Sequence, residues 1–410
     1  MKEPTNDLAP THAINRIHYL DALRGIAIFF IFSANIPYLS GFFFIRDAKP
    51  YSWAVFPFDE GFELILHTLV DGKFYTIFSL LFGIGFTIQY ENLKKRGLPF
   101  KPFFRRRMFW LLLFGGLHLC LIWIGDILTL YAILGFVLLN FVETEDKKLL
   151  KWAVILILLP IMNCIVIRFL NIDYPRFFFQ MNEYFASFFN LQTSKSDGLN
   201  LVSIEKEFAN ESLLSHFKIT FSNMFLRIGY ILYEGRPFKV LGIFLIGIWA
   251  GRRIIHADLL NNTDLLKKMG LYGILIGLPI SSVRTFFEIT HDGSKFYELY
   301  VTVTYALGTV PLALGFAALL ALLYIKRSNF FKYFEPVGKM ALTNYILQST
   351  LSILVFYGIG LGMVGKFRYT MLIIYCCIFY ILQIIFSTLW LKKFKIGPLE
   401  MLWRKFTYRK

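Results

Sequence analysis

The chain has 410 residues, of which 56% are apolar and only 17% are charged. Soluble domains usually contain about 25% charged residues. This deficit, together with long apolar runs, indicates a membrane protein and excludes a soluble enzyme, a disordered regulator and a secreted disulfide scaffold. The net charge is +16. Because basic residues of membrane proteins gather in cytoplasmic loops, we expect the lipid bilayer, and no nucleic acid, as the partner.

A membrane-spanning helix needs about 20 mainly apolar residues. Ten segments approach this requirement: 20–39, 62–90, 106–124, 127–142, 149–170, 238–251, 269–289, 298–323, 341–362 and 370–391. They predict one integral membrane domain, an all-α bundle of about ten transmembrane helices. The second segment is interrupted by Asp71-Gly72-Lys73.

The distribution of Lys and Arg predicts the orientation of the bundle. If every segment crosses once from a cytoplasmic N-terminus, the inside segments hold 27 of the 43 basic residues and the outside segments hold 11. Both termini are therefore expected in the cytoplasm. Segment 212–236 is also apolar, but it carries five ionisable residues, including Arg227, and a crossing there would reverse all later loops. We expect it to be an amphipathic helix at the outer interface, within an extracytoplasmic loop over 171–236.

Ionisable residues inside membrane helices cost about 2.5–3.5 kcal/mol each on insertion scales, so they usually face the bundle interior and mark function. The first segment opens with LDALRG, in which Asp21 and Arg24 share a helix face and can pair. Asn35 lies near the outer end of the same segment. The Asp–Arg pair fits either a functional site or a bridge that only fixes the helix at the interface.

Two histidines in the next segments are candidate general bases. His67 and Asp71 are one helical turn apart and fit a base with its orienting carboxylate, although an ordinary loop end also explains the same residues. His118 stands alone in an apolar helix, and Asp126 marks the turn that follows. Eight residues of continuous helix would separate these two by about 12 Å. We therefore expect the partner of His118 to come from another helix, with Asn35, His67 or Asp71 at comparable depth.

Arg105, Arg106 and Arg107 begin the helix of His118 on the cytoplasmic side. Retention of positive charge in the cytoplasm explains them. Binding of an anion, such as a nucleotide phosphate or a lipid headgroup, is the alternative. The ninth segment carries three polar residues: Asn344, Gln348 and Ser349. They can hydrogen-bond across helices or contact a substrate.

Five motifs occur in order along almost the whole chain: LDALRG, KFYTIFSLLFGIG, the RRR…GGLH…WIGDILTLYAILG block, GKMALTNYILQS and GPLEMLWR. Together they resemble the YeiB-like family of bacterial membrane proteins, which corresponds to domain of unknown function 418. That family is similar to a wider group of transmembrane acyltransferases, which includes the heparan-glucosaminide acetyltransferases and the bacterial acyltransferase-3 proteins. The resemblance implies a multi-pass protein of the bacterial cytoplasmic membrane.

The resemblance also bears on the catalytic base. In acyltransferase-3 proteins an Arg of the first span is followed after ten residues by a His. Arg24 matches that Arg, but Asn35 occupies the position of the His, and a carboxamide cannot act as a general base. The heparan-type relatives also lack a His there. His118 belongs to the family's GxxH…GD motif and is therefore the preferred base, with His67 as the alternative.

The resemblance, together with these residues, implies acyl transfer across the membrane from a cytoplasmic acyl-CoA to an acceptor hydroxyl or amine. The CoA phosphates would bind near Arg24 and the three consecutive arginines, with Asp21 and Lys73 also in the donor site. His118 would deprotonate the acceptor, Asp126 or Asp71 would orient the imidazole, and Asn35 would donate to the oxyanion.

Acyl-CoA is expected as a donor substrate, and we expect neither a bound cofactor nor a metal ion. The acceptor would be an envelope component or a small molecule. Two alternatives stay open. The first is a proton-coupled transporter, because a broken helix with buried His and Asp suits carriage. The second is a non-catalytic envelope protein whose intramembrane charges only support packing.

Overall fold

The computed structural model describes residues 17–45, 58–196, 198–202, 208–290, 294 and 296–408. The N-terminal segment 1–16, expected in the cytoplasm, lies outside these residues. The first half of the chain forms α1 (His18–Leu39), α2 (Phe42–Ile45), α3 (Asp59–Val70), α4 (Lys73–Lys95), α5 (Phe100–Leu117), a π-helical turn (His118–Ile122), α6 (Leu128–Leu138), a 3-10 turn (Leu139–Phe141), α7 (Asp146–Arg168), α8 (Arg176–Phe188), β1 (Thr193–Ser196) and β2 (Leu199–Val202).

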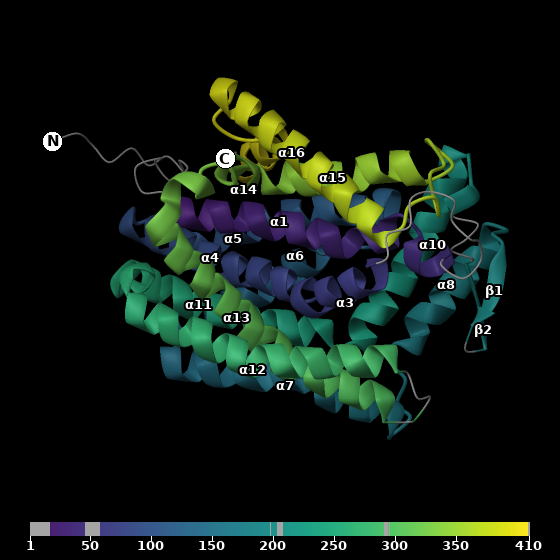
Figure 1. Ribbon diagram of the computed structural model, residues 1–410, viewed down its shortest axis with the longest axis horizontal. Helices are drawn as coiled ribbons and strands as arrows, with labels where there is room; N and C mark the ends of the chain where they lie inside the picture. Colours follow the sequence, from purple (N-terminus) through teal and green to yellow (C-terminus); the bar gives the residue numbers. More distant parts are fainter. Residues whose placement is uncertain are drawn as a thin grey trace.

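In the second half, every described element of secondary structure is a helix. It forms α10 (Leu213–Tyr233), α11 (Arg236–His256), a 3-10 turn (Leu259–Asn261), α12 (Thr263–Ile289), α13 (Tyr297–Phe331), α14 (Glu335–Lys339), α15 (Ala341–Phe356), α16 (Tyr369–Lys393) and α17 (Pro398–Tyr408). The long helices run side by side along the longest axis of the molecule (Figure 1). The predicted helical bundle is therefore confirmed, with one addition: β1 and β2 pair as a small antiparallel hairpin next to α8.

Six helical segments among the described residues are long and apolar enough to cross a membrane: His18–Phe44, Asp59–Lys95, Asp146–Arg168, Thr263–Ile289, Tyr297–Phe331 and Tyr369–Lys393. Two shorter apolar helices cover Leu128–Phe141 and Ala341–Phe356. Some predicted boundaries need correction. The segment expected at 106–124 begins earlier, at Phe100, and the short segment expected at 238–251 is the 21-residue helix α11.

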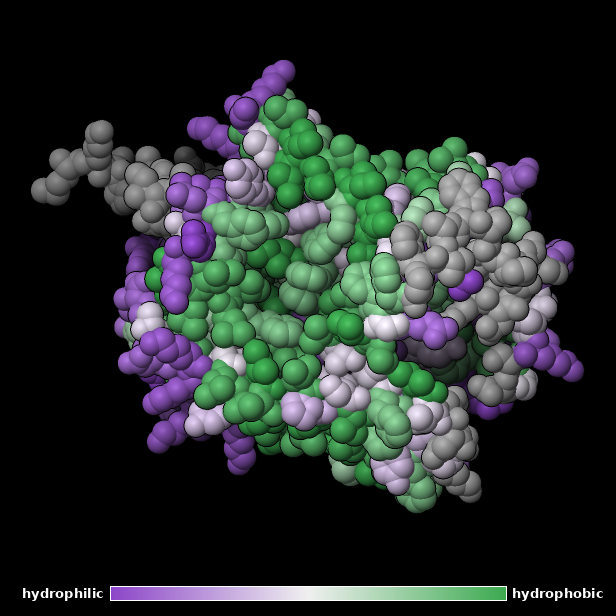
Figure 2. All heavy atoms as spheres, in the orientation of Figure 1, coloured by the Kyte–Doolittle hydropathy of each residue, from purple (hydrophilic) through white to green (hydrophobic). Residues whose placement is uncertain are grey.

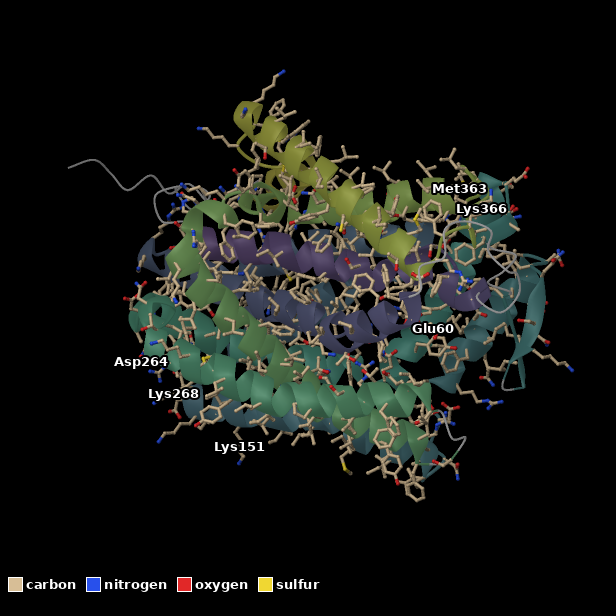
Figure 3. All side chains as sticks on the ribbon, in the orientation of Figure 1. Glu60, Lys151, Asp264, Lys268, Met363 and Lys366 are labelled. Carbon is tan, nitrogen blue, oxygen red and sulfur yellow. The ribbon has the colours of Figure 1, made fainter. Side chains whose placement is uncertain are left out.

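The surface agrees with a protein embedded in lipid. Apolar residues form the middle of the visible face and hydrophilic residues gather toward its two ends (Figure 2). Asp264 and Lys268 lie at the end where α12 begins, and Lys366 lies at the opposite end (Figure 3). Leu275 on α12 and Ile378 on α16 are more than half exposed. Exposed apolar side chains of this kind are suited to contact with the hydrocarbon chains of a bilayer and not with water.

The helices differ in how much they contact protein. In the most apolar stretch of each segment, 61% of the residues of α1 and 67% of those of α3–α4 are buried, against 28% for α16 and 33% for both α7 and α12. The first two are therefore central, and the other three form the periphery. The break predicted at Asp71-Gly72-Lys73 is confirmed. Gly72 has φ +79°, and a Cβ there would lie 2.7 Å from the Tyr305 ring, so only glycine fits.

The contact between α4 and α11 depends on glycine. A Cβ on Gly83 would lie 2.2 Å from the carbonyl oxygen of Phe244 and 2.9 Å from the Cα of Gly247. Gly83, in the FGIG motif, therefore allows the two helices to pack closely. Gly116 on α5 is different, because a Cβ there would meet no atom within 4 Å.

Replacing Gly83 should therefore destabilise the bundle. We expect Gly83→Ala to lower the free energy of unfolding by about 1–3 kcal/mol, the usual cost of overpacking. The matched variant Gly116→Ala should be neutral or should stabilise by up to about 1 kcal/mol, because alanine is the better helix former. Thermal unfolding of the two purified variants in the same detergent checks this. Equal melting temperatures would contradict the close contact.

Candidate functional site

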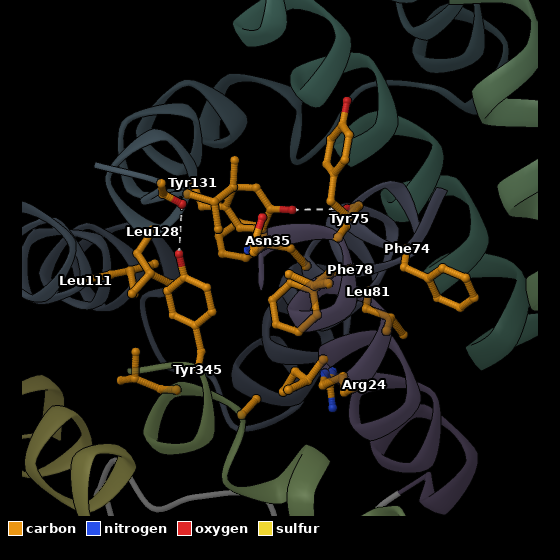
Figure 4. A pocket seen from close by; sticks show the side chains of 18 of the residues that line it. Arg24, Asn35, Phe74, Tyr75, Phe78, Leu81, Leu111, Leu128, Tyr131 and Tyr345 are labelled. Atoms are coloured by element: carbon orange, nitrogen blue, oxygen red, sulfur yellow. Dashed lines mark hydrogen bonds between the residues drawn. The ribbon is translucent and has the colours of Figure 1, made fainter. Parts of the chain in front are cut away.

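A cavity of about 680 Å³ lies inside the bundle, between α1, α4, α5, α6, α10, α15 and α17. This volume is within the range of about 300–1,000 Å³ found for ligand pockets. Its walls are mostly apolar and aromatic. Tyr131 and Tyr345 project into the space that Asn35 faces, with Phe78 and Leu81 on α4 nearby (Figure 4).

Four cations line one end of the cavity, which we call the basic end: Arg24, Arg107, Lys339 and Arg404. As predicted, Arg24 donates to Asp21, with 2.9 Å between Nη1 and Oδ1. Lys339 donates to Glu335 at 3.2 Å. The Arg107 guanidinium lies 3.8 Å from the centre of the Trp403 ring, but it forms no hydrogen bond or ion pair with any residue the structure describes.

The C-terminal helix α17 closes this end. The Glu400 carboxylate accepts hydrogen bonds from the backbone amides of Leu342 and Thr343, at 2.7 and 3.1 Å, and from the Thr343 hydroxyl at 2.6 Å. Burial raises the pKa of the Glu400 carboxyl, while the bonds from Thr343 oppose that shift. Trp403 donates through Nε1 to the carbonyl of Arg107 at 3.0 Å. The helix is therefore fixed to the start of α15 and to α5.

The opposite end, which we call the distal end, is lined by Asn35, Asp71, Arg227, Glu234 and Arg236. Asp71 accepts from Arg284 at 2.9 Å. Arg236 donates to Glu234 at 2.7 Å. Asn35 and Arg227 form no hydrogen bond or ion pair with any described residue. The distal end therefore contains two ion pairs, Asp71–Arg284 and Glu234–Arg236. It also contains one amide and one guanidinium that have no polar partner among the described residues.

His67 belongs to a network beside the distal end. Its Nε2 lies 2.6 Å from Oε2 of Glu288, whereas its Nδ1 lies 3.8 Å from Oδ2 of Asp71. Glu288, and not Asp71, is therefore its main partner. Arg284 also donates to Glu288 at 2.8 Å. Lys73 is 1% exposed and does not line the cavity.

His118 pairs with Asp126, one of the two carboxylates named above to orient it, and not with a residue of another helix. Its Nδ1 lies 3.1 Å from Oδ1 of Asp126, so the expectation that Asp126 is out of reach was wrong. The π-helical turn ends at Ile122, and Trp123 is extended, with φ −155° and ψ 135°. The chain therefore folds back, and Asp126 also accepts from the backbone amide of Thr129 at 2.8 Å.

His118 does not line the cavity. The side chain is fully buried, and no described group forms a hydrogen bond with its Nε2. The Tyr345 ring, whose centre is 5.2 Å from that of His118, faces the cavity. Tyr345 is held by a hydrogen bond from its hydroxyl to the carbonyl of Gly125, at 3.2 Å (Figure 4). The imidazole thus lies one residue layer behind the cavity wall.

Several predicted site residues lie away from the cavity. Arg105 and Arg106 are exposed, and of the three consecutive arginines only Arg107 lines it. The three polar residues of the ninth segment are buried and do not line it: Asn344, Gln348 and Ser349. Two of them make the cross-helix bonds that the sequence predicts, because Asn344 donates to Ser387 at 3.0 Å and Gln348 to Gln383 at 2.9 Å.

Four residues of the site and its surroundings were not among the predicted site residues: Arg227, Glu288, Tyr345 and Trp403. Arg227 was considered only as a charge that argued against a crossing at 212–236. The available signal was that charge itself, placed in an otherwise apolar helix. The other three become visible only when distant helices are brought together.

The fold and its cavity define a multi-pass α-helical membrane protein with an internal ligand-sized space. The family model described as "Protein of unknown function (DUF418)" matches residues 250–410. The uncharacterized protein YxaH of Bacillus subtilis is 30% identical, over 98% of this chain and 97% of its own. The uncharacterized protein YeiB of Escherichia coli is 26% identical, over 95% and 96%. The chain therefore belongs to the YeiB-like DUF418 family. No solved structure matches it significantly.

The Asp126 carboxylate should be important for stability. Asp126→Ala removes the partners of His118 Nδ1, which is buried, and of the Thr129 amide, which is half-buried. We expect a loss of about 2–5 kcal/mol in the free energy of unfolding. Asp126→Asn should lose less, because the amide oxygen can still accept. The control Asp264→Ala, at a side chain that is 84% exposed, should unfold like the parent; chemical denaturation in detergent compares all three.

Proposed function

We propose that this protein is an acyltransferase of the bacterial cytoplasmic membrane. It transfers an acyl group from a cytoplasmic acyl-CoA to an acceptor hydroxyl or amine held at the distal end of the cavity. The observation that carries the proposal is the cavity itself. It links the Arg107 guanidinium at the basic end to the Asn35 amide at the distal end, and neither group has a polar partner in the described part of the chain.

The topology in this proposal has ten crossings and cytoplasmic termini. The crossing elements are α1, α3–α4, α5, α6, α7, α11, α12, α13, α15 and α16. The basic end then faces the cytoplasm, in agreement with the excess of Lys and Arg in the inside segments. Helix α10 lies at the outer interface and forms part of the distal wall. The apolar middle of the surface supports the membrane location (Figure 2).

The donor site is argued from charge. A guanidinium that is removed from water without an anionic partner is costly. Arg24 and Arg404 lie near enough to Arg107 to repel it, so an anion at this end would offset both effects. The nucleotide phosphates of CoA supply that charge, and Arg binds phosphate well because its donors form a planar fork. The acyl arm would then extend between the aromatic walls, past Phe78 and Tyr131.

The chemistry is assigned to His118. Because the ionised Asp126 only accepts hydrogen bonds, Nδ1 carries the proton and Nε2 keeps a lone pair that can take another. The acceptor oxygen or nitrogen attacks the thioester carbon and gives its proton to Nε2. The new C–O or C–N bond forms, the C–S bond breaks, and the proton passes to the CoA thiolate. Asn35 would donate to the developing oxyanion. The Tyr345 ring must move aside for His118 to reach the acceptor.

A second function, proton-coupled transport, is favoured by one specific observation. The helix break at Asp71–Gly72 lies at the distal end, beside the Arg284 and Glu288 network. Transporters bind substrates at such interrupted helices. The two functions differ in their chemistry, since only the acyltransferase consumes acyl-CoA.

The donor site can be tested by binding. Acetyl-CoA should raise the melting temperature of the purified protein, because a ligand stabilises by RT ln(1 + [L]/Kd). We expect Arg107→Gln to weaken acetyl-CoA binding by about 10- to 100-fold, the usual effect of losing a charged hydrogen bond. Arg105→Gln, at an exposed neighbour, should bind like the parent. Equal affinities of the two variants would remove Arg107 from the donor site.

The base can be tested by turnover. With [¹⁴C]acetyl-CoA and membranes that contain the protein, His118→Ala should lose about 10²- to 10⁴-fold in the rate of product formation, as is typical of a general base. His67→Ala should retain most activity, because that imidazole is held by Glu288. Unchanged turnover in His118→Ala would exclude this base. If no labelled product forms and proteoliposomes take up substrate in response to a proton gradient, the protein is a transporter and not an acyltransferase.

A further inference from the structure

Five arginines line the cavity: Arg24, Arg107, Arg227, Arg236 and Arg404. Four of them have either a carboxylate partner or a place in the proposed donor site. Arg24 pairs with Asp21, and Arg236 pairs with Glu234. Arg107 and Arg404 belong to the basic end, where the acyl donor is proposed to bind. Only Arg227 is left without such a role. It lies at the distal end of the cavity, opposite the basic end where the CoA phosphates are proposed to bind.

Arg227 is held in place but is not neutralised. Its neighbour Leu226 is buried, and Tyr230, one turn later on α10, also lines the cavity. The Nε atom of Arg227 is inaccessible and has no hydrogen-bond partner within the described part of the chain. No carboxylate among those residues lies within 4.0 Å of the guanidinium.

Two carboxylates act electrostatically on Arg227, Glu234 and Asp126, and both already have other partners. Glu234 accepts from Arg236 at 2.7 Å. Asp126 accepts from His118 and from the Thr129 amide, at 3.1 and 2.8 Å. Asp126 cannot move to Arg227 without leaving the buried imidazole of His118 unpaired, which costs about 1–3 kcal/mol. Glu234 cannot move there without breaking its ion pair with Arg236. The unbalanced positive charge therefore favours an anion that enters the cavity from outside the protein.

We propose that Arg227 binds the phosphate group of the acyl acceptor, and that this acceptor is a phospholipid carrying a free hydroxyl on its headgroup. Arg binds phosphate through two parallel N–H donors. The surrounding wall is apolar and aromatic, with Phe74, Tyr38 and Ile31 among the lining residues, and such a wall suits the acyl chains of a lipid. The inference rests on the proposed function and specifies its acceptor.

Binding of defined ligands tests the site. The parent, Arg227→Gln and Arg227→Lys are purified as full chains, and each is titrated with short-chain phosphatidylglycerol, with the matched diacylglycerol and with glycerol 3-phosphate. Thermal shift measures each affinity. We expect phosphatidylglycerol to stabilise the parent, diacylglycerol to have little effect, and Arg227→Gln to bind phosphatidylglycerol about 10- to 100-fold more weakly. Arg227→Lys should be intermediate and keeps the test usable if Arg227→Gln does not fold.

The control is Arg176→Gln, at an exposed arginine on α8, which should bind phosphatidylglycerol like the parent. Equal stabilisation by glycerol 3-phosphate and phosphatidylglycerol would support the phosphate site but assign it to a soluble phosphate ester instead of a lipid. Equal affinity of Arg227→Gln and the parent for phosphatidylglycerol, or equal stabilisation by diacylglycerol, would overturn the proposal.

Failure of this site is distinguishable from failure of the acyltransferase. Acetyl-CoA binding should be unchanged in Arg227→Gln and weakened in Arg107→Gln, while phosphatidylglycerol binding should show the reverse pattern. If phosphatidylglycerol stabilises the protein and acetyl-CoA does not, acetyl-CoA is excluded as the donor and a binding site for lipid phosphate is still supported. Loss of the phosphatidylglycerol effect alone would leave an acyltransferase with another acceptor.

Discussion

The structure depends on one electrostatic constraint: an ionised group inside an apolar bundle must have a partner. Isolated charges in a low-dielectric interior are too costly to keep, and this chain pairs most of those it buries. Asp71 and Glu288 share Arg284, and Glu234 pairs with Arg236. Against this background, a guanidinium without an anionic partner is informative. Arg107 and Arg227 are the cavity arginines in that condition within the described residues, one at each end.

Helix packing creates the space that these charges face. Two glycines of the FGIG motif lie on different sides of α4. Gly83 allows α11 to approach within backbone contact, whereas a Cβ on Gly85 would meet only the Arg24 guanidinium, at 3.7 Å. One short motif thus closes the bundle on one side and leaves room on the other. Because both effects come from the absence of a side chain, the motif combines stability with an open cavity.

Local features were predictable from the sequence, and contacts between distant segments were not. The break at Gly72 and the Asp21–Arg24 pair follow from residue type and helical spacing. The pairing of His118 with Asp126 was missed, because the spacing argument assumed a continuous helix, whereas the chain reverses after a π-helical turn. The bond of His67 to Glu288 joins residues more than 200 positions apart. Periodicity within one helix carries no information about such a contact.

Helix α10 illustrates how a charge pattern can have two causes. Its polar residues argued against a membrane crossing and for a helix facing water at the interface. Yet Arg227 and Glu234 line the cavity, and His216 is buried. The amphipathic pattern of α10 is therefore explained in part by an internal polar space, since a cavity wall selects charged residues as water does. A charged residue in an apolar helix thus indicates a polar environment, and only the fold decides whether that environment is solvent or a binding site.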